Sequence, residues 1–103
     1  MNNNKVTFIL HKPQLSENIG ACARAIKNFN FEKLYLIDPK PIFPNDKILA
    51  TSVGAKDIIK KSKVFDNLES SLGDIDILIA TSARFRNKNV KHINLEGLKK
   101  IDF

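Results

Sequence analysis

Tryptophan is absent from this chain of 103 residues, and cysteine occurs only once. Because the single Cys22 cannot form a disulfide within the chain, it agrees with a reducing compartment and is expected to act as a small core residue. No apolar run approaches the ~20 residues that a membrane-spanning helix needs. Residues 1–5 also lack the long apolar stretch of a signal peptide. We therefore expect a cytoplasmic protein with no membrane contact.

Glycine is also scarce, and the four glycines lie far apart, at Gly20, Gly54, Gly73 and Gly97. This spacing excludes both the dinucleotide-binding fingerprint and the phosphate-binding loop of the nucleoside triphosphatases. The chain has no Gly-x-Ser-x-Gly elbow and no cluster of cysteine and histidine. We therefore expect no metal site and none of these common catalytic motifs.

Acidic residues are outnumbered, with 11 Asp and Glu against 17 Lys and Arg, which gives a net charge of +6. An excess of positive charge favours a polyanionic partner such as nucleic acid. Lysines used only for solubility would give the same sum. One segment is locally basic, because Arg84, Arg86, Lys88 and Lys91 follow one another without an intervening acid.

Short apolar runs alternate with helical patterns along the whole chain. The predicted strands are 6–10, 34–37, 64–65 and 75–80, and the predicted helices are 17–28, 46–52, 55–61 and 66–72. Ser16 and Asp66 are the predicted N-caps of the first and last helices. This alternation predicts one α/β domain over 1–103, with a parallel sheet and helices on both faces. In such sheets ligands bind at the carboxyl ends of the strands, here near His11, Asp38 and Thr81.

The helix predicted at 17–28 carries one arginine among small residues. A spacing of 100° per residue places Gly20, Arg24 and Lys27 on one face, opposite an apolar stripe that includes Ile19 and Ala23. An open slot at Gly20 would let Arg24 reach a phosphate or a sugar near the start of the helix. From the spacing alone, a solvated surface arginine is the simpler interpretation.

The stretch from Pro13 to Lys27, which contains Asn-Ile-Gly-Ala-Cys-Ala-Arg-Ala, resembles the first motif of the SpoU/TrmH-type ribose 2′-O-methyltransferases of the SPOUT class. It is most similar to the TrmJ-like branch, which acts on tRNA. The segments 36–39, 50–57, 66–68 and 80–84 follow in the order of that family. The resemblance therefore implies an enzyme that uses S-adenosylmethionine to methylate RNA, either tRNA or rRNA.

The resemblance also assigns roles to individual residues. It implies a catalytic pair, Asn18 and Arg24, and part of an S-adenosylmethionine site at Thr81, Ser82 and Ala83. The basic residues that would suit RNA phosphates are Lys27, Arg84 and Arg86. Without the family, Thr81 and Ser82 would be interpreted as caps of a turn, and the arginines as an exposed basic loop.

The chemistry implied for Arg24 is electrostatic. A guanidinium stays protonated in proteins and is therefore a poor base. We expect Arg24 to stabilise the alkoxide that develops on the ribose oxygen and to anchor a neighbouring phosphate. Asn18 would hold Arg24 or the sugar by hydrogen bonds. On this hypothesis the head group of Arg24 lies close to Thr81.

The family's two later motifs, a Phe-Gly-x-Glu-x-x-Gly-Leu pattern and the loop that forms a trefoil knot, do not occur before Phe103. We therefore expect a SPOUT-type domain truncated before the knot. Most of the S-adenosylmethionine pocket and the segment that makes the family homodimeric would be missing, and the chain alone would not transfer a methyl group. The alternatives are a non-catalytic RNA-binding remnant of such an enzyme and an unrelated doubly wound ligand-binding domain.

Overall fold

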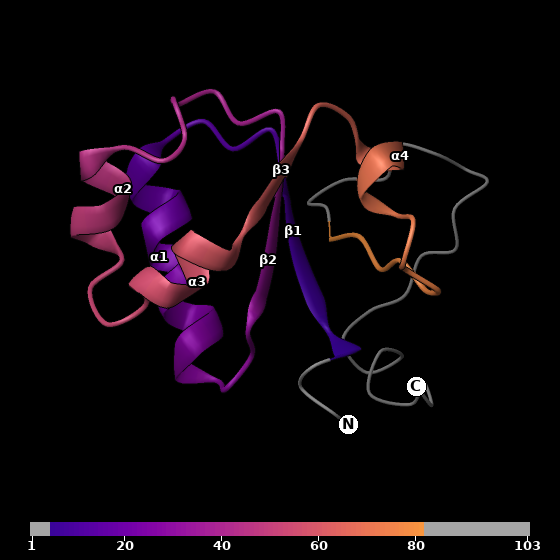
Figure 1. The fold of residues 1–103 in the computed structure, drawn as a ribbon, viewed down its shortest axis with the longest axis horizontal. Coiled ribbons are helices and arrows are strands. Elements are labelled where there is room, and N and C mark those ends of the chain that lie inside the picture. The colour runs from indigo at the N-terminus through magenta and orange to yellow at the C-terminus, as the bar shows by residue number, and fades with distance from the viewer. Residues whose placement is uncertain (1–4, 82–103) are drawn as a thin grey trace.

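A computed structural model describes residues 5–81 of the chain, which form a parallel sheet with helices on both sides (Figure 1). The elements in chain order are β1 (Thr7–His11), α1 (Ser16–Asn28), β2 (Lys33–Ile37), α2 (Asp46–Thr51), α3 (Lys56–Lys61), β3 (Lys63–Phe65) and α4 (Leu68–Ser71). The strands lie in the order β1-β2-β3, and both pairs are parallel. Helices α1, α2 and α3 cover one side of the sheet, and α4 lies on the other. The predicted fold class is confirmed.

The main hydrophobic core lies between the sheet and the three helices on its first side. Ile19, Ala23 and Ile26 of α1 are buried, as the spacing predicted, and belong to the same cluster as Leu34 and Leu36 of β2. The cluster also includes buried side chains from the later helices and the turn between them, Ile48, Ala55, Ile58 and Ile59. Burial of these side chains is the main stabilising contribution to this layer.

The strand predicted at 75–80 does not form in the described part of the chain. The segment follows α4 and lies with it on the side of the sheet away from α1 (Figure 1). Its side chains Ile77, Leu78 and Ile79 are 60%, 48% and 41% exposed. An apolar run becomes a strand when a neighbouring strand pairs with it and side chains cover it. Within residues 5–81, this run pairs with none of the three strands.

Both predicted caps were wrong: α1 has no side-chain cap, and α4 is capped by an asparagine. Helix α1 begins at Ser16 itself, and the residue before it makes no capping bond with its side chain. Helix α4 is capped by Asn67, whose Oδ1 accepts a hydrogen bond from the backbone N–H of Ser70 at 2.9 Å. Asp66 lies one residue too early to reach the first turn. An oxygen-bearing side chain caps a helix only from the residue that directly precedes it.

Two residues that directly follow strands have left-handed backbones. Lys12 has φ 53°, and its N–H donates to the carbonyl of Ile37 at 2.7 Å. Asp38 has φ 44°, and its N–H donates to the carbonyl of Phe65 at 2.8 Å. Non-glycine residues rarely adopt this conformation. Each extends its strand pair by one hydrogen bond and turns the chain away at the carboxyl edge of the sheet.

Candidate nucleic-acid interface

Helix α1 is held against α2 by a contact between Gly20 and Thr51. Gly20 is buried, and a Cβ atom built on it would lie 2.9 Å from the carbonyl carbon of Thr51. The hydroxyl of Thr51 donates hydrogen bonds within α2, to the carbonyls of Lys47 at 2.9 Å and Ile48 at 3.2 Å. The predicted open slot at Gly20 is therefore wrong, because α2 fills it. Helical spacing alone did not show which neighbouring element covers that face.

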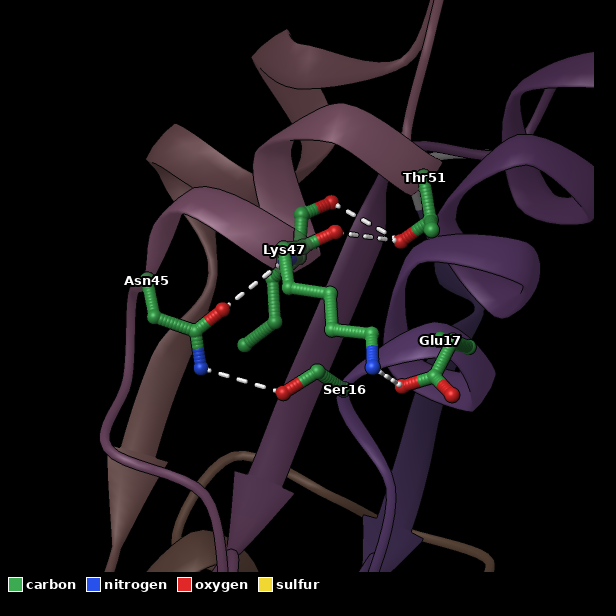
Figure 2. Close-up of polar contacts among 6 residues, drawn as sticks. Ser16, Glu17, Asn45, Lys47 and Thr51 are labelled. Atoms are coloured by element: carbon green, nitrogen blue, oxygen red, sulfur yellow. Dashed lines mark hydrogen bonds and ion pairs between the residues drawn. The ribbon is translucent and has the colours of Figure 1, made fainter.

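Asn45 joins the start of α2 to the start of α1 (Figure 2). Its Oδ1 accepts from the N–H of Ile48 at 2.8 Å and so caps α2. Its Nδ2 donates to Ser16 Oγ at 3.0 Å and to the carbonyl of Ile42 at 2.9 Å. Sequence reasoning missed this residue, although an Asn directly before a helical pattern is a known capping signal. Asn45 therefore fixes the first turn of α1, which carries Asn18.

An ion pair adds to the same junction. Lys47 Nζ lies 3.3 Å from Glu17 Oε1 (Figure 2). The pKa of the Glu17 carboxyl is lowered, first by a hydrogen bond from its own backbone N–H and then by Lys47. Both side chains are largely exposed, so the pair adds little to stability. Its effect is to place a carboxylate at the N-terminal end of α1, where the helix dipole favours negative charge.

Asn18 and Arg24 are both exposed on α1. Arg24 lies beside an open hollow of about 550 Å³ between α1 and the turn that joins α2 to α3. The residues that line this Arg24 hollow are Ala21, Arg24, Ala25, Lys27, Asn28, Val53, Gly54 and Ala55. No carboxylate of residues 5–81 forms an ion pair with Arg24. The guanidinium is therefore open to an external anion.

Lys27, unlike Arg24, forms an ion pair within the described residues. Its Nζ lies 2.8 Å from Asp57 Oδ2, so the ion pair joins α1 to α3 at one side of the Arg24 hollow. The hydrogen bond from Lys27 lowers the pKa of the Asp57 carboxyl, although its partial burial acts in the opposite direction. The two charges cancel locally. Lys27 is consequently a weaker candidate for contacting RNA phosphates than its helix position suggested.

On the other side of the sheet, Tyr35 and Asp74 lie together. Tyr35 is only 6% exposed, and its OH donates to Asp74 Oδ2 at 3.3 Å. Its ring lies 5.1 Å from that of Phe65, and Lys63 Nζ is 5.7 Å from its centre. Burial raises the pKa of the Tyr35 phenol, and the neighbouring Asp74 carboxylate raises it further. Tyr35 thus belongs to the core of this second layer.

Comparison with known proteins gives the decisive finding. Residues 5–101 match the SpoU rRNA Methylase family. The chain belongs to this family. The SpoU match contains the Asn18-to-Arg24 motif on α1 and runs through all seven helices and strands of the described region. An unrelated doubly wound domain is thereby excluded.

Named relatives support the assignment to the SpoU family. The chain is 35% identical over 89 residues to the tRNA (cytidine-2′-O-)-methyltransferase TrmJ of Methanocaldococcus jannaschii, covering 85% of this chain and 38% of that protein. It is 42% identical over 85 residues to LasT of Escherichia coli, described as an uncharacterized tRNA/rRNA methyltransferase, covering 82% and 36%. A solved structure of a probable methylase family protein from Haemophilus influenzae superimposes with a TM-score of 0.76 at 33% identity, covering 82% and 36%. The chain therefore spans little more than a third of the length of these relatives.

The structure brings only some of the SpoU-type site residues together. Asn18, Arg24 and Lys27 lie on one helix, whereas Thr81 is exposed and belongs to no helix or strand of the described region. The strand that was expected to carry Thr81 toward Arg24 is not formed within residues 5–81, so the proximity of these two residues stays a prediction. The other predicted residues, Ser82, Ala83, Arg84 and Arg86, lie outside the described residues.

The remaining features of this region concern the Cys22 thiol, metal ligands and membrane-spanning helices. Cys22 is half-buried, and burial raises the pKa of its thiol, which agrees with a structural role and not with a nucleophile. Within residues 5–81, no three His, Cys, Asp or Glu side chains are grouped as metal ligands would be. None of the helices in this region is both long enough and apolar enough to span a membrane.

Proposed function

We propose that this chain is the RNA-facing N-terminal part of a ribose 2′-O-methyltransferase that uses S-adenosylmethionine, with tRNA as its substrate. The observation that carries the proposal is the family match over residues 5–101 together with an exposed Arg24 on α1. The relative from Methanocaldococcus jannaschii is named as a tRNA 2′-O-methyltransferase. A cytoplasmic location, where tRNA is available, forms part of the same proposal.

The part of this reaction proposed for the described residues is to hold the RNA. The guanidinium of Arg24 would bind a phosphate and stabilise negative charge on the ribose oxygen. Asn18, six residues earlier on α1, would hydrogen-bond to the sugar. Because Asn45 and Thr51 fix α1 against α2, this helix can present both side chains in a constant geometry.

S-adenosylmethionine supplies the methyl group in the chemistry that the family implies. Of the three residues assigned to it by resemblance, Thr81 alone lies in the described region, where it is exposed. The other two, Ser82 and Ala83, lie outside the described residues. Arg24, which is exposed and makes no ion pair within residues 5–81, also supports a second candidate, a chain that binds RNA without transferring a methyl group by itself.

Two measurements separate these candidates and test both. Retention of tRNA in a native gel should be weakened by Arg24→Ala and not by Lys60→Ala, which removes the same charge from an exposed position on α3. Calorimetric titration with S-adenosylmethionine should then show whether the chain binds the methyl donor. Saturable heat favours the enzyme, and retention of tRNA without heat favours the RNA-binding chain. If the wild-type chain retains no tRNA, both candidates are wrong.

A further inference from the structure

We propose that the Arg24 hollow binds one unpaired nucleotide of an RNA strand, with the phosphate at Arg24 and the base against Val53. This inference rests on the proposed function. It adds that the turn between α2 and α3, which forms the second wall of the hollow, also contacts the RNA. Neither the sequence motif nor the family match assigns a role to that turn. The proposal thus commits the substrate at this face to a single-stranded segment of RNA.

The size and the lining of the Arg24 hollow fit a nucleotide. Its volume of about 550 Å³ lies within the range of roughly 300–1,000 Å³ that is common for small-ligand sites. Helix α1 contributes Ala21 and Ala25, whose small side chains leave the hollow unfilled on that side. On the turn, Gly54 has φ 80° and no atom within 4 Å of the position of a Cβ, so the turn leaves that side open.

The charge of the Arg24 hollow fits one phosphate. Of the two cations that line it, Lys27 is neutralised by Asp57 at 2.8 Å, whereas Arg24 has no carboxylate partner within residues 5–81. A guanidinium presents a planar set of N–H donors that matches two oxygens of a phosphate. One unpaired cation in the hollow therefore implies one direct phosphate contact.

The apolar part of the Arg24 hollow fits the face of a base. Val53 is 68% exposed and lies in the same hollow as Arg24. An exposed aliphatic side chain beside a cation offers a surface on which an unstacked base can lie, and the base is reachable only where the RNA is single-stranded. The exposed amide of Asn28 also lines the hollow and can donate to and accept from the edge of that base.

The test uses the full chain and two variants that add the same negative charge to an exposed apolar residue. Val53→Glu places a carboxylate in the Arg24 hollow, and Ile42→Glu places one on a residue that is 85% exposed and does not line it. Binding of a fluorescent single-stranded RNA and of its duplex is measured by anisotropy. Circular dichroism and thermal melting confirm that each variant is folded.

We expect Val53→Glu to weaken binding of the single strand by about tenfold, because the new carboxylate repels the phosphate at Arg24. Ile42→Glu, which lies outside the hollow, should weaken it by about twofold at most. Duplex binding should respond equally to both variants. Asn28→Ala should alter the relative affinities of the chain for single-stranded poly(A), poly(C), poly(G) and poly(U), because its amide is proposed to contact the edge of the base. Arg24→Gln should reduce the slope of log K against log salt by about 0.7, the value for one phosphate on a single strand, while Lys60→Gln should leave the slope unchanged.

Several outcomes would overturn the inference. If the wild-type chain binds RNA but Val53→Glu and Ile42→Glu reduce its affinity for the single strand by the same factor, the nucleotide site is absent and the proposed function stands. If the chain is a dimer in solution that Val53→Glu alone dissociates, a second copy covers the hollow instead of RNA. If wild-type chain binds neither RNA form, the proposed function itself fails, and this inference fails with it.

Discussion

Gly20 of α1 lies so close to Thr51 of α2 that no side chain fits between the two helices. A Cβ on residue 20 would lie 2.9 Å from the carbonyl carbon of Thr51, which is backbone and cannot rotate away. The contact fixes the distance between the helix that carries Arg24 and the turn that forms the opposite wall of the hollow.

Replacing this glycine should therefore destabilise the chain. We expect Gly20→Ala to lower the free energy of unfolding by about 1–3 kcal/mol, because overpacking outweighs the better helix propensity of alanine. Gly73→Ala is the matched control, since no atom lies within 4 Å of its Cβ position, and it should change stability by less than about 0.5 kcal/mol. Urea denaturation measures both. Equal effects of the two variants would show that the close packing is absent.

Asn45 can be tested in two steps that separate its cap from its link to α1. Asn45→Ala removes the acceptor for the N–H of Ile48 and both donated bonds, and should cost about 1–2 kcal/mol of stability. Asn45→Asp keeps the capping oxygen but loses the Nδ2 group that donates to Ser16 Oγ on α1 and to the carbonyl of Ile42, so its loss of stability should be smaller. Chemical denaturation of the three proteins gives the order. If the aspartate variant is as unstable as the alanine variant, the cap is not the main contribution.

Tyr35 allows a direct titration, because it is the only tyrosine and the chain has no tryptophan. Its pKa is raised by burial and by Asp74, so the absorbance of the phenolate should appear at higher pH in the folded chain than in the chain unfolded by urea. Since the folded pKa exceeds the unfolded one, stability should be fully present below the unfolded pKa. It should decrease as pH rises from there through the folded pKa. Equal titration midpoints in the two states would contradict the buried contact.

Asp57 should limit the affinity of this face for RNA, because it neutralises Lys27. We expect Asp57→Asn to strengthen RNA binding and to steepen the slope of log K against log salt by about 0.7, as one more phosphate is contacted. Glu69→Gln, which removes one negative charge from α4 on the other side of the sheet, is the control and should have a smaller effect. Anisotropy at several salt concentrations measures both. A weaker or unchanged affinity in Asp57→Asn would mean that freed Lys27 does not reach the RNA.

Periodicity was sufficient for the parts of the fold that depend on local pattern. The stripe of Ile19, Ala23 and Ile26 and the strand at β2 were correctly predicted, because burial on one face leaves a regular trace in the sequence. The segment 75–80 shows the limit of that reasoning. Its apolar run predicted a strand, yet a strand also needs a partner, which residues 5–81 do not supply.

The candidate site was predictable by residue but not by arrangement. The motif identified Asn18 and Arg24, and both are exposed on α1 as a binding role requires. The wall formed by Val53 and Gly54 was missed, since it depends on how a turn distant in sequence packs beside α1. The same lack of tertiary information led to the wrong prediction of an open slot at Gly20.

Amide NMR of the chain during titration with RNA is the sharpest test of whether α1 binds RNA, because it requires no substitution. On titration with a single-stranded RNA, we expect the largest shift changes in the exposed half of α1 from Asn18 to Asn28 and in the turn at 53–55. The α4 helix should shift little. Changes confined to α4 and the segment 75–81, with α1 unaffected, would contradict the claim that this helix presents Arg24 to RNA.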